Sequence, residues 1–331
     1  MKVQEQYQHQ PYGHCETGVV SSLLRHHGLD LSEPMVFGLS SGLMFAFVPF
    51  LKMNGMPVVA YRVFPKLIIR GIQSRLGMKF RKLTYRDPQK AMNDLDTFID
   101  AGQVVGLQVN IYWLPFFPPE QRVQINVHNI VIFGKENGEY LVSDPAFKDV
   151  VTIKREDLQK ARFAKGQLAP KGYLYYPVFI PEDIDIGKMI RASIKRTLWM
   201  MSSAPAPCGL RGILYMADKI EKMDQKKDFK YTKLFLGHIA RMQEEIGTGG
   251  GGYRFMYAAF LQEAHKTLSL AVLQDASAKM TETGDLWRGF ALSCAKGFRS
   301  RNGNIDLSHI AQLLRKCYAS EREVYGMLKN I

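Results

Sequence analysis

The chain has 331 residues, which suggests about two domains, and its 46% hydrophobic and 23% charged residues are typical of a folded globular protein. This composition excludes a disordered chain, a collagen and a coiled coil. The net charge is +13, from 44 lysines and arginines against 31 aspartates and glutamates. Such an excess favours an anionic partner, which could be nucleic acid, a membrane surface or an acidic protein.

No segment predicts export or membrane insertion. Residues 1–10 are polar and glutamine-rich, without the apolar core of a secretory signal. The longest uncharged apolar stretch, residues 35–51, is interrupted by glycine, serine and proline and is shorter than the ~20 residues of a membrane span. The four cysteines lie far apart without a CxxC pair, which disfavours a disulfide framework and a zinc site. We therefore expect a cytoplasmic protein with no bound metal.

The first half of the chain predicts a mixture of helices and strands. Apolar residues at helical spacing after Cys15, followed by Gly28, predict a helix of about three turns that begins at the cysteine. A second helix is expected over residues 88–101. Strands are expected over residues 57–64, 79–85, 104–113, 150–153 and 173–179.

Residues 126–147 predict a β-hairpin. Two apolar runs flank the dipeptide Asn137-Gly138, which is a strong signal for a tight turn between antiparallel strands. Folding the chain about this turn brings His128 and Asp144 within one position of the same register. A carboxylate placed in this way would hold the imidazole.

Proline and acidic residues near residue 182 predict a domain boundary, so we expect domains at 1–182 and 183–331. The second half lacks strand-like runs and predicts helices, the longest of which could each be two. These helices are expected over residues 186–202, 209–246, 253–281, 284–299 and 306–329. The expected fold class is α+β, with a mixed N-terminal domain followed by an all-α C-terminal domain.

Cys15 is the candidate nucleophile of this sequence. A thiol at the start of a helix and beside an imidazole is stabilised as the reactive thiolate. Asp144 would orient His128, and His128 would take the proton from Cys15. The backbone N–H of Cys15 would donate to the oxyanion of an acyl transfer, and the side chain of Gln10 is a candidate for the second donor. A cysteine can instead be a small buried apolar residue, which is our expectation for Cys208, Cys294 and Cys317.

The positive charge is concentrated in residues 62–90 and 188–241. At the start of the second stretch, apolar residues at helical spacing from Ile186 alternate with lysine and arginine, which predicts a basic amphipathic helix. Such a helix is usually packed on its own domain with a solvated basic face. Contact with a membrane surface and docking of an acidic protein are the alternatives. Aromatic residues interleave the first stretch, as in platforms that stack nucleic-acid bases, namely Tyr61, Phe64, Phe80 and Tyr85.

Several blocks of the sequence carry a family resemblance. They are His14-Cys15-Glu16-Thr17-Gly18, Leu31-Ser32-Glu33-Pro34-Met35-Val36-Phe37-Gly38-Leu39, Val127-His128-Asn129-Ile130-Val131 and Ser143-Asp144-Pro145. Together they resemble the N-terminal domain of the butirosin biosynthesis protein H-like family. Residues 246–264 are similar to the helical domain that commonly follows it.

The resemblance implies a papain-like fold, similar to that of the C39 bacteriocin-processing peptidases. It also implies transfer of an acyl or aminoacyl group from an acyl carrier protein thioester, through Cys15, to an amine or hydroxyl acceptor in a biosynthetic pathway. The expected partners are then an acidic carrier protein with its phosphopantetheine arm and a small-molecule acceptor. The glutamine that this family usually carries six residues before the cysteine is replaced by His9.

A glycine run at residues 247–252 opens into Tyr253 and Arg254. Backbone N–H groups at such a helix start can hold a phosphate, and the phosphopantetheine of a carrier protein offers one. The candidate ligands are Gly249, Gly250 and Arg254. The run lacks the Gly-Lys-Ser/Thr ending of an ATP-binding loop, and a hinge between helices is the alternative.

Three functions remain open from the sequence. The favoured one is a carrier-dependent acyltransferase with Cys15, His128 and Asp144 as a catalytic triad. The same triad could serve a C39-like peptidase or thioesterase with water as the acceptor. The third is a non-enzymatic binder of membranes or nucleic acid, although no known nucleic-acid motif is present, so we expect no nucleic acid. Peripheral membrane contact and assembly into a homo-oligomer stay open.

Overall fold

The computed structural model describes residues 6–53, 55–246, 249–301 and 304–331. The chain divides into two compact units, the first formed by residues 1–36 and 72–184 and the second by residues 37–71 and 185–331. The first unit is a mixture of sheet and helix, and residues 185–331 of the second are helical. The α+β class is therefore confirmed.

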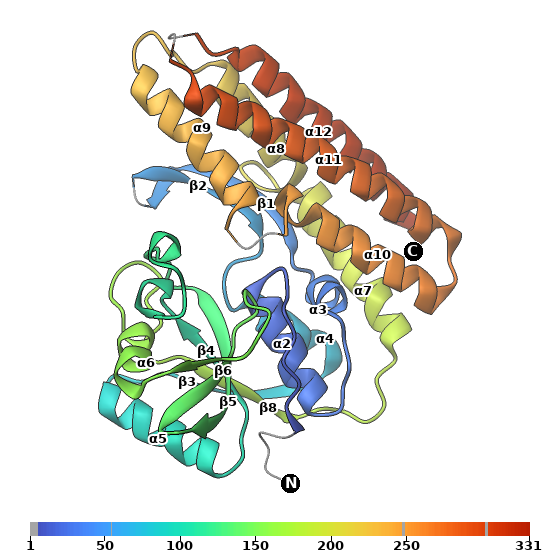
Figure 1. Ribbon diagram of the computed structural model, residues 1–331. Helices are drawn as coiled ribbons and strands as arrows, with labels where there is room; N and C mark the ends of the chain where they lie inside the picture. The colour runs from blue at the N-terminus through green and yellow to red at the C-terminus, as the bar shows by residue number, and fades with distance from the viewer. Residues whose placement is uncertain (1–5, 54, 247–248, 302–303) are drawn as a thin grey trace. The chain divides into compact units, whose positions relative to one another are not determined.

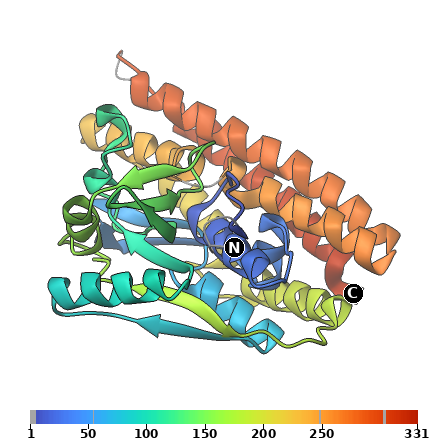
Figure 2. The same cartoon turned by 60° about the horizontal axis from the view of Figure 1, so that its bottom comes forward.

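The first unit is built on a six-stranded antiparallel sheet. In spatial order its strands are β3 (Lys79–Leu83), β8 (Leu174–Phe179), β4 (Val105–Val109), β5 (His128–Glu136), β6 (Glu139–Ser143) and β7 (Val151–Ile153). Helix α2 (Cys15–His26) packs on β4, β5 and β8. Figure 2 shows α5 (Pro88–Asp100, cyan) lying along the sheet.

Helices α5 and α6 (Arg155–Arg162) share an apolar core with the sheet. Its members include Met92 and Leu95 of α5, Leu107 and Ile130 of the sheet, and Leu158 of α6. Burial of these aliphatic side chains is the main force that holds the helices on the sheet. Two short 3₁₀ turns, Ile111–Trp113 and Pro119–Gln121, interrupt the connection from β4 to β5.

The predicted hairpin is present as β5 and β6. Glu136 pairs with Glu139 across a two-residue turn, and Asn137 and Gly138 have φ of 50° and 82°. Two positive φ values are the signature of the type I′ turn that Asn-Gly favours. A register shift between Ile132 and Gly134 leaves Val131 opposite Ser143. Ser143 is the last residue of β6, so Asp144 directly follows the strand.

The second unit consists of one hairpin and a set of packed helices. Its elements are β1 (Leu43–Met53), β2 (Met56–Arg62), α7 (Ile186–Leu198), α8 (Gly209–Glu221), α9 (Phe229–Glu244), α10 (Arg254–Leu268), α11 (Ala271–Arg299) and α12 (Leu307–Met327). Helix α11 packs on α9, α10 and α12, and Figure 1 shows it beside α12. A π-helical turn, Trp199–Ser203, extends α7, and 3₁₀ turns lie at Gly251–Tyr253 and Leu328–Asn330.

The structure differs from the sequence-based division for residues 37–71. A boundary at residue 182 puts these residues in the N-terminal domain. They cluster with the second unit because their aromatic side chains pack there. Phe45 and Tyr61 lie with ring centroids 5.6 Å and 5.7 Å from Trp287 of α11, and Phe47 lies 6.0 Å from Phe235 of α9. The prediction also missed four elements: α3 (Glu33–Leu39), β1, α4 (Leu67–Leu76) and α6.

The stretch over 209–246, which the sequence left open as one helix or two, is two helices, α8 and α9, with residues 222–228 between them. One helix boundary was predicted wrongly. The expected break near residue 282 is absent, since α11 runs through Gly284 and the break falls at Ser269, whose φ is 54°. Gly284 does not end the helix because it makes room for Phe255: a Cβ there would lie 2.7 Å from the ring.

No helix in the described part of the chain is both long and apolar enough to cross a membrane.

Candidate active site

The start of α2 positions Cys15 as the first residue of the helix. His14 caps the helix in an extended conformation, and its ring accepts a hydrogen bond from the backbone N–H of Thr17. The Glu33 carboxylate accepts from the backbone N–H groups of Gly13 at 2.9 Å and His14 at 2.7 Å. Burial raises the pKa of Glu33, although these hydrogen bonds oppose the shift. This polar anchor holds the loop that presents the thiol.

His128 and Asp144 meet as the hairpin predicts. His128 Nε2 lies 2.7 Å from Asp144 Oδ2, and the two side chains are 7% and 0% exposed. Asp144 Oδ1 accepts the backbone N–H of Ala146 at 2.9 Å. Both oxygens of the carboxylate therefore have partners, and the carboxylate holds the imidazole at a set angle.

Cys15 completes this group, since its side chain interacts with the His128 ring and favours the protonated imidazole, which raises the pKa of the ring. Because Nε2 is engaged by Asp144, the nitrogen left for Cys15 is Nδ1. Burial opposes protonation of His128, but Asp144 and Cys15 outweigh it and raise the pKa of the imidazole above its ordinary 6.5. An imidazolium beside a thiol favours the thiolate. The structure thus brings together the three residues expected to form the triad.

Asn129 is a further residue of this site that the sequence did not single out. Its Nδ2 lies 3.8 Å from Cys15 Sγ and donates to the Val127 carbonyl at 3.0 Å. Its Oδ1 accepts a hydrogen bond of 2.9 Å from the hydroxyl of Tyr175 on β8. The only signal in the sequence was the position of Asn129 directly after His128.

Aromatic side chains pack beside His128, and hydrogen bonds fix the segment that precedes Cys15. The ring of Phe117 lies 5.7 Å from that of His128, and the ring of Phe147 lies 4.8 Å from Phe117. Upstream of the cysteine, the Tyr12 N–H donates to Pro145 O at 2.9 Å, and His9 Nδ1 lies 2.7 Å from Ser143 Oγ. The segment before Cys15 is therefore fixed to the end of β6.

Gln10 does not lie where an oxyanion donor is needed. Its Oε1 accepts a hydrogen bond from Arg25 Nη1, and the side chain is exposed. Arg25 is ten residues beyond Cys15 on the same helix, a rise of roughly 15 Å. The amide of Gln10 is thus held toward the opposite end of α2, and its prediction as the second oxyanion donor is wrong.

The glycine run and Arg254 do not fit a phosphate. Arg254 is fully buried, and its Nε and Nη2 lie 2.9 Å and 2.8 Å from Glu321 Oε1. The N–H of Gly251 donates to the Glu244 carboxylate. Carboxylates of the protein thus take the donors that a phosphate would need. Gly249 is exposed and Gly250 buried, and residues 247 and 248 lie outside the described residues.

The aromatic residues of the 62–90 stretch do not form a stacking platform. Tyr61 and Phe80 are 3% and 7% exposed, so no base could reach their faces, and Phe64, at 56%, is the only one of the four aromatic residues that is exposed. The stretch is also shared between the two units, which meet in sequence at Gly71 and Ile72. The idea of a nucleic-acid surface therefore loses the feature on which it rested.

A thiol at a helix start, an imidazole and a buried carboxylate are the parts of a cysteine enzyme. The chain belongs to the family described as Domain of unknown function (DUF4872), which matches residues 156–328, more than half of its length. Residues 14–145 match the family described as Butirosin biosynthesis protein H, N-terminal, which confirms the resemblance noted in the sequence. Family membership and the site together support a cysteine enzyme.

Among solved structures, a chain described as a C39-like peptidase from Bacillus anthracis is similar. The identity is 17%, the match covers 54% of this chain and 94% of that one, and the TM-score is 0.35. No curated protein matches this chain.

Proposed function

We propose that the protein is a cysteine-dependent acyltransferase that takes an acyl or aminoacyl group from the phosphopantetheine thioester of an acyl carrier protein. The observation that carries the proposal is the contact of Cys15 with a His128 ring that Asp144 holds at 2.7 Å. The match to a family named for a butirosin biosynthesis protein supports a biosynthetic role.

In the first half-reaction the Cys15 thiolate attacks the thioester carbonyl carbon. A bond forms between Sγ and that carbon while the carbonyl electron pair moves onto oxygen. Collapse of this intermediate breaks the bond to the phosphopantetheine sulfur, which leaves with the proton of the His128 imidazolium. The acyl group is then held as a thioester on Cys15.

In the second half-reaction an amine or hydroxyl acceptor attacks the acyl group and gives its proton to His128. The bond to Sγ breaks, and Cys15 leaves as a thiolate beside the restored imidazolium. Asp144 stabilises the charged ring in both halves, because its carboxylate is buried against Nε2. Water in place of the acceptor would give hydrolysis with the same residues.

Acylation of Cys15 tests this function directly. Incubation with an acyl carrier protein loaded with an acyl group should add the acyl mass to the peptide that contains Cys15, and Cys15→Ala should show no adduct. The half-buried Cys208 should stay unmodified and serves as an internal reference. Hydrolysis of a peptide bond by a protein whose Cys15 accepts no acyl group from the carrier would refute the proposal.

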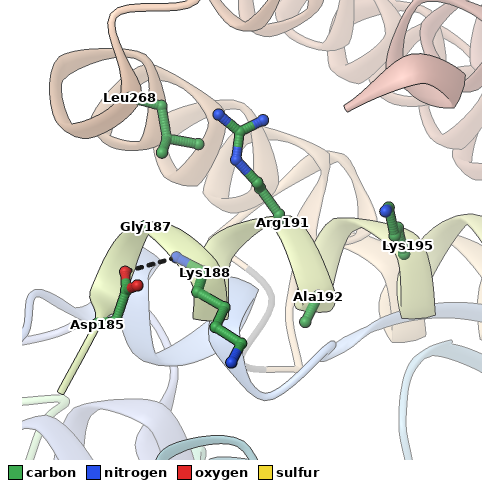
Figure 3. Close-up of a pocket in the computed structure, with 7 residues that line it drawn as sticks. All are labelled: Asp185, Gly187, Lys188, Arg191, Ala192, Lys195 and Leu268. Atoms are coloured by element: carbon green, nitrogen blue, oxygen red, sulfur yellow. Dashed lines mark hydrogen bonds between the residues drawn. The ribbon is translucent and has the colours of Figure 1, made fainter.

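We further propose that the acidic carrier protein docks at the basic face of α7. A pocket of about 530 Å³ on this helix is lined by Lys188, Arg191 and Lys195, with Asp185 and Leu268 also on its wall. Figure 3 shows Arg191 extending from α7 toward Leu268 of α10. Among the described residues no carboxylate forms an ion pair with these three cations. Free positive charge of this kind attracts an acidic surface.

Reversing two of these charges should weaken carrier binding. Lys188→Glu combined with Arg191→Glu is expected to raise the dissociation constant of a fluorescently labelled acyl carrier protein about tenfold at low salt, measured by fluorescence anisotropy. Arg196→Glu is the matched control, since Arg196 lies on the same helix but stacks over Trp199 outside the pocket. Equal effects of the two changes, or binding of anionic lipid vesicles in place of the carrier, would contradict docking at the pocket.

A further inference from the structure

The contacts of Asn129 suggest a role in the chemistry and not only in packing. His128 and Asn129 are consecutive in β5, so their side chains point to opposite faces of the sheet. Cys15 interacts with both, because its sulfur lies near the end of the strand, 3.8 Å from Asn129 Nδ2, and its side chain favours the protonated His128 ring. The thiol therefore has the imidazole on one side and the amide on the other.

The orientation of the Asn129 amide is determined by its partners. Val127 O, 3.0 Å from Nδ2, can only accept a hydrogen bond, so the NH₂ group and not the oxygen must face it. The amide oxygen, Oδ1, accepts a hydrogen bond from the hydroxyl of Tyr175. Tyr175 is fully buried, and burial holds its pKa well above 10, so the phenol remains a donor. One hydrogen of the Asn129 NH₂ group is thus bonded to the Val127 carbonyl oxygen, and the other is directed at Cys15 Sγ.

We infer that Asn129 Nδ2 donates to the oxyanion that forms when Sγ attacks a carbonyl carbon, the role that the sequence assigned to Gln10. In that intermediate the oxygen is one bond from the carbon that Sγ has joined, so it comes within reach of a donor already directed at Sγ. Asn129 is then a catalytic residue and Tyr175 a positioning residue. The inference rests on the proposed function and adds to it the second donor beside the Cys15 N–H.

Two reagents separate this role from a structural one. Acylation of Cys15 by p-nitrophenyl acetate passes through a tetrahedral oxyanion, whereas alkylation by iodoacetamide does not. At pH 9, Asn129→Ala should lower the acylation rate by about 10²–10³-fold, while the alkylation rate stays within about threefold of the wild type. Tyr175→Phe should lower acylation by roughly tenfold without changing alkylation, because the amide loses its positioning partner but remains present.

Asn129→Leu is the second variant, nearly equal in volume but with neither the donor nor a charge, and should match Asn129→Ala. Gln10→Ala is the control amide and should acylate at the wild-type rate. Equal losses in acylation and alkylation, or a folded Asn129 variant acylated at the wild-type rate, would overturn the inference, as would a wild type whose Cys15 does not react with p-nitrophenyl acetate. Failure of the carrier thioester to acylate Cys15 would instead refute the proposed function, since the ester reaction needs no carrier.

Discussion

Replacing His128 by alanine is expected to lower the rate of Cys15 acylation by at least about 10³-fold. The imidazolium stabilises the thiolate and protonates the leaving phosphopantetheine sulfur, and both tasks end with its removal. Transfer of the acyl group from a loaded acyl carrier protein to the Cys15 peptide, followed over time by mass spectrometry, measures the rate. His128→Ala leaves the buried Asp144 carboxylate without its partner. If this change impairs folding, His128→Gln is the companion variant, because glutamine keeps a hydrogen-bond donor near the carboxylate.

The pH dependence of alkylation gives a second measure of the same residue. The pKa of His128 is raised in the folded protein, so the ring stays protonated through neutral pH and the thiolate beside it persists below pH 7. Wild-type Cys15 should therefore react with iodoacetamide at pH 6. His128→Ala should react only as pH rises toward the ordinary thiol pKa of about 8.5.

Asp144→Asn provides an intermediate case, since the amide keeps the shape of the carboxylate but not the charge that holds an imidazolium. We expect a loss of at least about 10²-fold in acylation. His27→Ala is the matched histidine control, because His27 is exposed at the far end of α2. A His128→Ala protein that acylates at the wild-type rate would refute the role of His128 as the acid and base of the site.

The sequence predicted those parts of the site that depend on local structure. The helix that begins at Cys15 has its own stop at Gly28, whose φ is 86°, and the hairpin has its own turn at Asn137-Gly138. Once the hairpin is predicted, His128 and Asp144 fall at the same end of it, because strand pairing relates positions on the two strands to their distance from the turn; the register shift between Ile132 and Gly134 is the detail that the sequence did not predict.

The errors share a different cause, which is a partner far away in the sequence. Arg254 looked available to a phosphate because its counter-charge, Glu321, lies 67 residues further on. Asn129 was overlooked because Tyr175, which orients its amide, is 46 residues away. Residues 43–62 cluster with the second unit and not with the rest of the first half because Trp287, which packs against Phe45 and Tyr61, is on α11. Neither hydrophobic periodicity nor turn residues report such contacts.

Removing Glu321 should destabilise the second unit more than any other single change to its charged residues that we describe. The carboxylate accepts hydrogen bonds from Arg254, from Trp287 Nε1 at 2.6 Å and from the Tyr325 hydroxyl at 3.0 Å, and it is fully buried. Glu321→Ala would leave the Arg254 guanidinium charged in an apolar interior, at a cost of about 3–5 kcal/mol in the free energy of unfolding.

Urea unfolding of the full chain measures this cost, and two controls isolate its origin. Arg241→Ala breaks an exposed ion pair between Arg241 of α9 and Glu245, which directly follows the helix, and should cost under about 0.5 kcal/mol. The double change Arg254→Met and Glu321→Leu removes both charges and should be much less destabilising than Glu321→Ala, because no uncompensated charge remains. If Glu321→Ala and the double variant unfold at the same urea concentration, the loss comes from packing and the buried charge pair is not the cause. None of these substitutions lies in the first unit. The reactivity of Cys15 with iodoacetamide at pH 6 therefore reports separately on whether the first unit stays folded.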